Sequence, residues 1–180
     1  PQAYDQVRPT PLQGDFVYSK GKSTFRVQLP NGKYKAWFLY GHSRYGQRVL
    51  NPLPMGYQID INGNNVVDER IKYWREFFSE KHFFRGYSYV YHADDDFYSK
   101  YVAPNFSEAT VSFEVSDGHV DFILRDIPLC AMRIDPLERA AQAEYETAYL
   151  RKELRRYTLI KEVPPAADHS EPPYSAQDKK

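Results

Sequence analysis

The sequence contains very little sulfur, with one cysteine, Cys130, and two methionines among 180 residues. A single cysteine excludes an intrachain disulfide, and one thiol does not settle the cellular compartment. Cys130 lies in the apolar run LCAMRI. These neighbours predict a small buried side chain rather than a nucleophile, because a reactive thiolate needs an electropositive environment.

An excess of charge and a long apolar run are also missing. The chain has 24 basic and 24 acidic residues, so its formal net charge is zero. This balance argues against nucleic-acid binding, which needs a basic face to displace counterions. No apolar run approaches the roughly 18 residues that cross a bilayer, and no signal peptide is visible. Because the chain starts at Pro1 rather than Met, we expect a processed or excised piece of a longer protein.

Motifs of known enzyme chemistry are absent as well. No GxSxG, P-loop or GxGxxG pattern occurs, and the five histidines show no HExxH spacing that would indicate zinc. Glu76, Glu80 and Glu108 are the carboxylates that an acid/base pair would draw on, but nothing in the sequence fixes their separation. We therefore expect no catalytic residue and no cofactor.

Three pairs of segments with alternating apolar residues predict strands joined by tight turns. The pairs are 25–29 with 34–40 around Asn31-Gly32, 57–61 with 66–67 around residues 62–64, and 111–115 with 120–124 around Asp117-Gly118. We expect each pair to form a hairpin, and residues 130–134 to form a last strand. Hairpins without interleaved helices predict a mainly β fold, an antiparallel sandwich or barrel.

A change of period after Asp135 predicts a helix over about 136–157. Asp135 fits the N-cap, Pro136 the first helical position and Glu138 the capping-box acid. The apolar stripe that we expect is modest and consists of Leu137, Ala141, Tyr145 and Ala148. This stripe is too weak for a core helix, so we expect the helix to lead to another module or to dock on a partner.

Residues 71–101 are the most unusual part of the sequence, because twelve of these 31 residues are aromatic. Tyr87, Tyr89 and Tyr91 alternate with Ser and Val, which indicates a further strand. The sequence leaves three uses for the rings open: packing over the sandwich, stacking on a sugar, or contact with a protein. The residues that would bind a sugar, by ring stacking or by hydrogen bonds, are Tyr73, Trp74, Arg85, Tyr87, Tyr89, Tyr91, Asp94 and Asp96.

Three consecutive acids, Asp94, Asp95 and Asp96, follow His92 within this segment. Calcium takes six to eight oxygen ligands from several loop positions, which three neighbouring acids do not supply by themselves. The pattern therefore favours a solvated acidic loop, with a structural calcium completed by remote ligands as the alternative.

Several strand and turn motifs together resemble the galactose-binding-like jelly rolls. These motifs are FRVQLPNGKYKAWFLYG, YQIDINGNNVV, VSFEVSDGHVDFIL and AMRIDP, and the resemblance covers roughly residues 16–135. Malectin-like domains and the carbohydrate-binding modules of polysaccharide-degrading enzymes belong to this group. The resemblance implies an antiparallel jelly-roll β-sandwich, and relatives bind oligosaccharides through loop aromatics, some with a structural calcium. No ligand-binding motif matches position by position, so no functional residue is carried over.

The sequence thus predicts an extended lead-in at 1–15, the sandwich at 16–135, a helical connector at 136–160 and a flexible tail at 161–180. We expect a non-catalytic carbohydrate-binding module of a larger secreted or periplasmic protein, which itself can be a carbohydrate-active enzyme. Its partner would be an oligosaccharide or polysaccharide. The alternative is a protein-interaction or assembly domain, or a homo-oligomer, that uses residues 71–101 and the charged helix as contact surfaces.

Overall fold

The chain forms two antiparallel sheets that face each other. The computed structural model describes residues 2–4, 11–18, 21–41, 56–70, 98–99, 103 and 106–158. Sheet A contains, in spatial order, β1 (Gln2–Tyr4), β2 (Phe16–Tyr18), β9 (Leu129–Pro136), β4 (Gly32–Gly41) and β7 (Phe106–Val115). Sheet B contains β3 (Lys22–Gln28), β8 (His119–Arg125), β5 (Gln58–Ile61) and β6 (Asn64–Asp68). The prediction of a mainly β, antiparallel sandwich is confirmed, while the jelly-roll topology stays a prediction.

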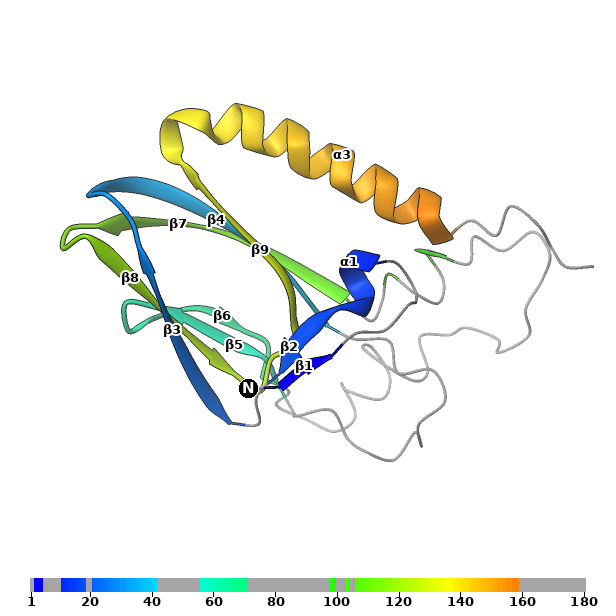
Figure 1. Cartoon of the computed structure of the whole chain (residues 1–180), viewed down its shortest axis with the longest axis horizontal. Helices are drawn as coiled ribbons and strands as arrows, with labels where there is room; N and C mark the ends of the chain where they lie inside the picture. Colours follow the sequence, from blue (N-terminus) through cyan, green and yellow to red (C-terminus); the bar gives the residue numbers. More distant parts are fainter. Residues whose placement is uncertain are drawn as a thin grey trace, which may run out of the picture.

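One long helix covers the outer side of sheet A. After the short 3-10 helix η4 (Leu137–Arg139), α3 (Ala140–Thr158) runs along this sheet, and sheet B lies on the other side of the molecule (Figure 1). The predicted C-terminal helix is therefore confirmed. Residues 1–15 contain β1, which extends sheet A, and the single-turn helix α1 (Pro11–Gly14).

Among the described helices, none is long and apolar enough to cross a membrane.

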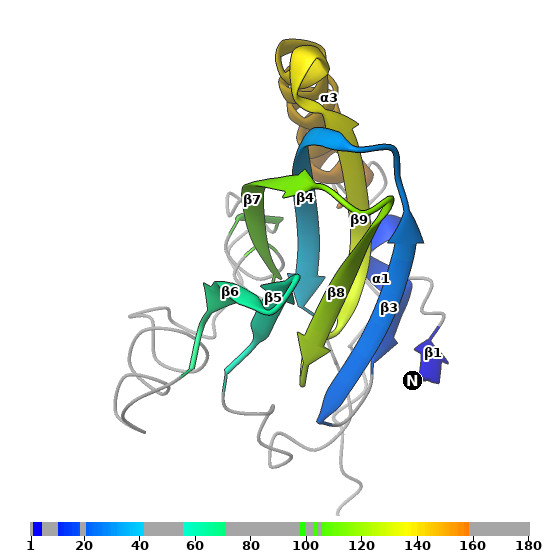
Figure 2. The same ribbon diagram turned by 90° about the vertical axis from the view of Figure 1, so that its left-hand side faces the viewer.

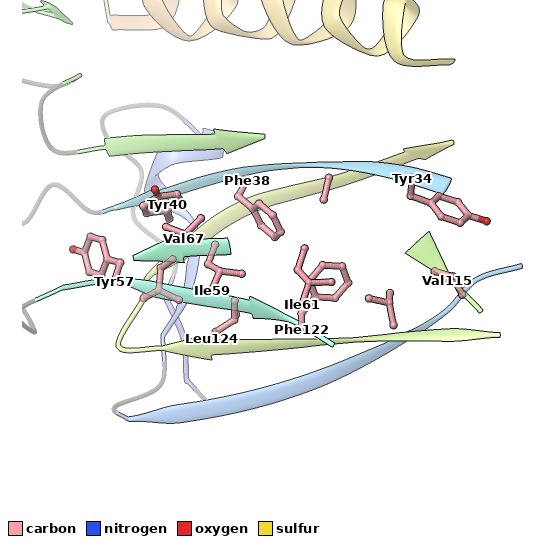
Figure 3. Packing of buried hydrophobic residues seen from close by; sticks show 13 residues of the cluster. Tyr34, Phe38, Tyr40, Tyr57, Ile59, Ile61, Val67, Val115, Phe122 and Leu124 are labelled. Carbon is pink, nitrogen blue, oxygen red and sulfur yellow. The ribbon is translucent and has the colours of Figure 1, made fainter. Parts of the chain in front are cut away.

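The hydrophobic core lies between the two sheets. Phe38 of β4 points down toward Ile59, Phe122 and their neighbours on sheet B (Figure 3). Phe122 is fully buried and makes three ring contacts, stacking on Phe25 at 5.2 Å and meeting Phe38 and Phe113 edge-on at 5.9 Å. The inward residues come from alternating positions of each strand, because successive side chains of a strand point to opposite faces.

Two of the three predicted hairpins are wrong in their pairing. β3 and β4 are consecutive strands but belong to different sheets, and so do β7 and β8 (Figure 2). Their turns are therefore arches from one sheet to the other, and β3 pairs with β8 while β4 pairs with β7 and β9. Only β5 and β6 form the expected ladder, with a register shift between Ile59 and Asp60.

The two arches lie against each other, which stabilises this arrangement. The Asn31 carboxamide oxygen accepts a hydrogen bond from the Gly118 amide at 2.8 Å, and the Leu29 amide donates to the Gly118 carbonyl at 3.0 Å. Gly118 has a φ of +76°, in the left-handed region that favours glycine. The turn residues predicted where the chain reverses, but the long-range contacts decide which sheet receives the next strand.

The details of the predicted helix also need correction. Pro136, the last residue of β9, takes the N-cap position without a side-chain hydrogen bond, so Asp135 is not the cap. Asp135 instead accepts a hydrogen bond from Arg133. The expected stripe does not face the sheet: Leu137 is 40% exposed and Tyr145 is 71% exposed. The buried face follows a second 3–4 spacing, with Ala143, Thr147 and Leu154 buried and Ala140 and Leu150 half-buried.

Candidate functional site

The longest connections of the described fold leave from one end of the sandwich. Residues 42–55 follow Gly41 of β4 and lead to β5, and residues 71–97 follow β6. Gly41 pairs with Phe106 at the start of β7, and Gln58 pairs with Asp68 at the end of β6. We call this end, where Gly41, Gln58, Asp68 and Phe106 lie, the loop end. Long connections between packed elements commonly carry binding residues, so the loop end is the candidate site.

Two tyrosines join the sheets at the loop end. Tyr40 of sheet A and Tyr57, the residue before β5 of sheet B, meet edge-on with ring centroids 5.8 Å apart (Figure 3). The Tyr40 hydroxyl donates a hydrogen bond of 2.7 Å to Oε1 of Glu69, and the Glu69 amide donates to the Tyr57 carbonyl at 2.9 Å. Glu69 stands two residues before the aromatic segment 71–97. The chain at Glu69 is therefore held by contacts with Tyr40 and Tyr57.

Both phenols stay protonated in the folded protein. Burial raises the pKa of Tyr40 above its ordinary value, and the hydrogen bond to the Glu69 carboxylate raises it further. Burial also raises the pKa of Tyr57, with a smaller contribution from Glu69. A neutral hydroxyl that donates to a carboxylate positions that group and supplies no phenolate for chemistry. The pair is thus an anchor for the loop end.

Tyr98, the residue that follows segment 71–97, packs on the outer face of sheet A. Tyr98 packs against the buried cluster of Trp37, Leu39 and Leu154 beneath α3. Its hydroxyl accepts a hydrogen bond of 3.3 Å from Nε2 of Gln13. Of the twelve aromatic residues in 71–101, Tyr98 is the one that lies within the described residues, and it has a packing role.

Glu108 and Cys130, which the sequence analysis considered as reactive groups, both make structural contacts. Glu108 accepts a hydrogen bond of 2.7 Å from Nε1 of Trp37 and forms an ion pair of 2.6 Å with Arg151 of α3. The Cys130 thiol donates to the Gly41 carbonyl at 3.3 Å, and burial raises its pKa to about 12. A thiol with so high a pKa carries almost no thiolate at neutral pH, so Cys130 is a packed side chain, although it is half-buried rather than fully buried as predicted.

The outer face of sheet B carries polar groups that bind one another. Asp60 is 7% exposed, accepts a hydrogen bond of 2.8 Å from Asn65 and forms an ion pair of 3.0 Å with Arg125. Arg26 and Asp121 form a cross-strand pair at 2.7 Å. These contacts pair four charged side chains within the sheet. The sequence favours a turn-forming role for Asp60 and Asn65, whereas alternation along β5 and β8 would have placed Asp60 and Arg125 on one face.

The predicted sugar-binding residues lie outside the described residues, and so does the strand expected at 87–91. They are Tyr73, Trp74, Arg85, Tyr87, Tyr89, Tyr91, Asp94 and Asp96. Their roles stay predictions. Within the described ranges, no group of three or more His, Cys, Asp or Glu side chains has an arrangement suited to a metal ion.

Comparisons with known proteins are distant. No protein family model matches the sequence, and no curated protein matches it. Among solved structures, a Bacteroides uniformis beta-glucuronidase 2 is similar over 76% of this chain, with 10% identity and a TM-score of 0.42. A family GH115 4-O-methyl-alpha-glucuronidase with specificity for decorated arabinogalactans is similar over 76% of the chain, with 9% identity and a TM-score of 0.40. The chain spans 13% and 16% of the lengths of these two proteins. Likeness at this level assigns no function.

Proposed function

We propose that this chain is a non-catalytic glycan-recognition domain, a galactose-binding-like jelly roll within a larger secreted or periplasmic protein. The observation that carries the proposal is the fixed position of the residues on both sides of the aromatic segment 71–97. Glu69, before it, is bound by Tyr40 and Tyr57, and Tyr98, after it, packs on sheet A. Ring-rich connections that leave from well-fixed points of a sandwich support a role in sugar recognition.

The chemistry of the segment suits a sugar. Tyrosine and tryptophan rings cover the apolar face of a pyranose, which is the role proposed for Tyr73, Trp74, Tyr87, Tyr89 and Tyr91. Arg85, Asp94 and Asp96 would bind the hydroxyl groups around that face. The proposal needs no cofactor. A structural calcium held by the acidic run would be detected as a loss of binding in EDTA that added calcium restores.

The test is binding of the purified chain to an array of oligosaccharides and polysaccharides. We expect Trp74→Ala and Tyr89→Ala to reduce binding to the recognised glycan at least about fivefold, because each removes a stacking ring worth about 1 kcal/mol or more. Tyr145→Ala is the matched control, since its ring lies on α3 and is 71% exposed. We expect it to leave binding unchanged.

Two results would contradict glycan recognition. One is the absence of binding to any glycan by a chain whose circular dichroism shows the folded sandwich. The other is equal loss of binding in Trp74→Ala and in the Tyr145→Ala control, which would place the contact away from the loop end. In either case the alternative of a protein-interaction domain would replace it.

A further inference from the structure

Gly56 ends the first of the two long connections at the loop end, and it lies directly against the chain that begins the second. It follows residues 42–55 and stands two residues before β5, whereas Arg70 stands two residues after β6 and leads into residues 71–97. A Cβ atom added at Gly56 would overlap the Arg70 Cα and would lie 2.7 Å from the Arg70 amide nitrogen. Only a residue without a side chain fits at this position.

Gly63, at the other end of the same hairpin, provides a direct comparison. Gly56 has a φ of +126° and Gly63 has a φ of +82°, both in a region that residues with a side chain rarely adopt. A Cβ atom added at Gly63 would meet no atom within 4 Å. The two glycines therefore share a positive φ, but only at Gly56 does another backbone segment occupy the space of a side chain.

Hydrogen bonds hold the chain on both sides of the contact between Gly56 and Arg70. The Glu69 amide donates to the Tyr57 carbonyl at 2.9 Å, one residue away from the contact on each strand. The Arg70 amide donates to Oδ1 of Asp68 at 3.1 Å, and the Arg70 guanidinium forms an ion pair with the same carboxylate. The end of connection 42–55 and the residues before segment 71–97 thus lie together at one well-fixed point of the loop end.

We propose that Gly56 is a positioning residue of the loop end, and that glycan binding by segment 71–97 depends on its contact with Arg70. The contact brings two backbones closer together than any other residue at position 56 would allow. A side chain there would push Arg70 away and displace the point from which segment 71–97 starts. Gly56 acts in this way through Arg70 rather than on the glycan. The inference rests on the proposed glycan recognition.

The first test compares two glycine variants on the same array of oligosaccharides and polysaccharides. We expect Gly56→Ala to reduce affinity at least about tenfold, because a displacement of about 1 Å is enough to lose well-positioned contacts. Gly63→Ala is the matched control, since it has the cost of a positive φ in the same hairpin without the overlap. It should bind like the unmodified chain.

The second test needs no glycan and measures amide hydrogen exchange by NMR. The Glu69 amide, which donates to the Tyr57 carbonyl, should exchange at least about tenfold faster in Gly56→Ala than in Gly63→Ala, because the overlap opens the chain locally. The amide of the fully buried Phe122 should exchange at similar rates in the two variants.

A change at Arg70 loosens the contact without an overlap, so it also serves where Gly56→Ala does not fold. Arg70→Gly and Arg70→Ala both lose the ion pair with Asp68. Only Arg70→Gly also loses the Cβ atom beside Gly56 and gains backbone freedom. We expect Arg70→Gly to bind about two- to fivefold more weakly than Arg70→Ala.

Equal binding by folded Gly56→Ala and Gly63→Ala, or equal exchange at Glu69, would overturn the positioning role of Gly56. If Gly56→Ala is unfolded, equal binding by Arg70→Gly and Arg70→Ala would overturn it. The absence of binding by the unmodified chain would instead contradict glycan recognition. The exchange rates at Glu69 would then still decide whether Gly56 positions the chain at Arg70.

Discussion

Arg133 is the residue that ties α3 to the sheet beneath it. Its Nε donates to Asp135 at 2.7 Å, and its Nη2 donates to the Thr147 hydroxyl at 2.9 Å and to the Ala143 carbonyl. Arg133→Met should lower the free energy of unfolding by about 2–3 kcal/mol, because it leaves a largely buried carboxylate without its partner. The measurement is urea denaturation followed by circular dichroism. Arg26→Met is the control, since this side chain is 54% exposed and its ion pair should contribute less than about 1 kcal/mol.

The Cys130 thiol and the Tyr40 phenol stay protonated in the folded protein, which makes its stability sensitive to alkaline pH. The pKa of the Cys130 thiol rises from 9.0 to about 12, and burial raises the pKa of the Tyr40 phenol above 10.0. Because the folded state holds these protons more tightly, their contribution to stability is complete below the ordinary pKa values. It is lost as the pH rises from about 9 toward 12.

Tyr40→Phe tests this dependence. The variant should be less stable at neutral pH by about 1 kcal/mol, because the Glu69 carboxylate loses a hydrogen bond. Above pH 10 its free energy of unfolding should fall less steeply than that of the unmodified chain, since one titrating group is gone. Urea denaturation at a series of pH values measures both effects. Parallel curves from neutral to alkaline pH would show that Tyr40 does not titrate with unfolding.

At the level of the element, the sequence predicted strands better than their partners. The alternation of apolar and polar residues predicted β3, β7 and β8 as strands, because one face of each strand is polar. The turns at Asn31-Gly32 and Asp117-Gly118 reverse the chain locally. The turn residues do not determine which of the two sheets the next strand joins. The same limit applies to α3, where two apolar stripes compete. The sequence analysis selected the exposed stripe that contains Leu137 and Tyr145, whereas Leu150 and Leu154 belong to the stripe that packs on sheet A.

Leu154 provides the test of how α3 is held on sheet A. It is 5% exposed and packs with Trp37 and Leu39. Leu154→Ala should destabilise the fold by about 2–4 kcal/mol, through lost apolar burial and the cavity left behind. Leu137→Ala is the same change at a position that is 40% exposed, and it should cost less than about 0.5 kcal/mol at a protein concentration where the chain is monomeric. Equal costs in urea denaturation would contradict the docking of α3 through this cluster.

At the scale of the whole molecule, composition located the candidate segment but not its attachment. Twelve rings in residues 71–101 stand out in any reading of the sequence. Nothing in that segment predicts that β4 contacts the residues that flank it, Glu69 before it and Tyr98 after it. Leu39 and Tyr40 are neighbours in β4 and point to opposite faces, so one contacts the cluster beneath α3 and the other contacts Glu69 at the interior. This attachment depends on tertiary contacts between residues far apart in the chain.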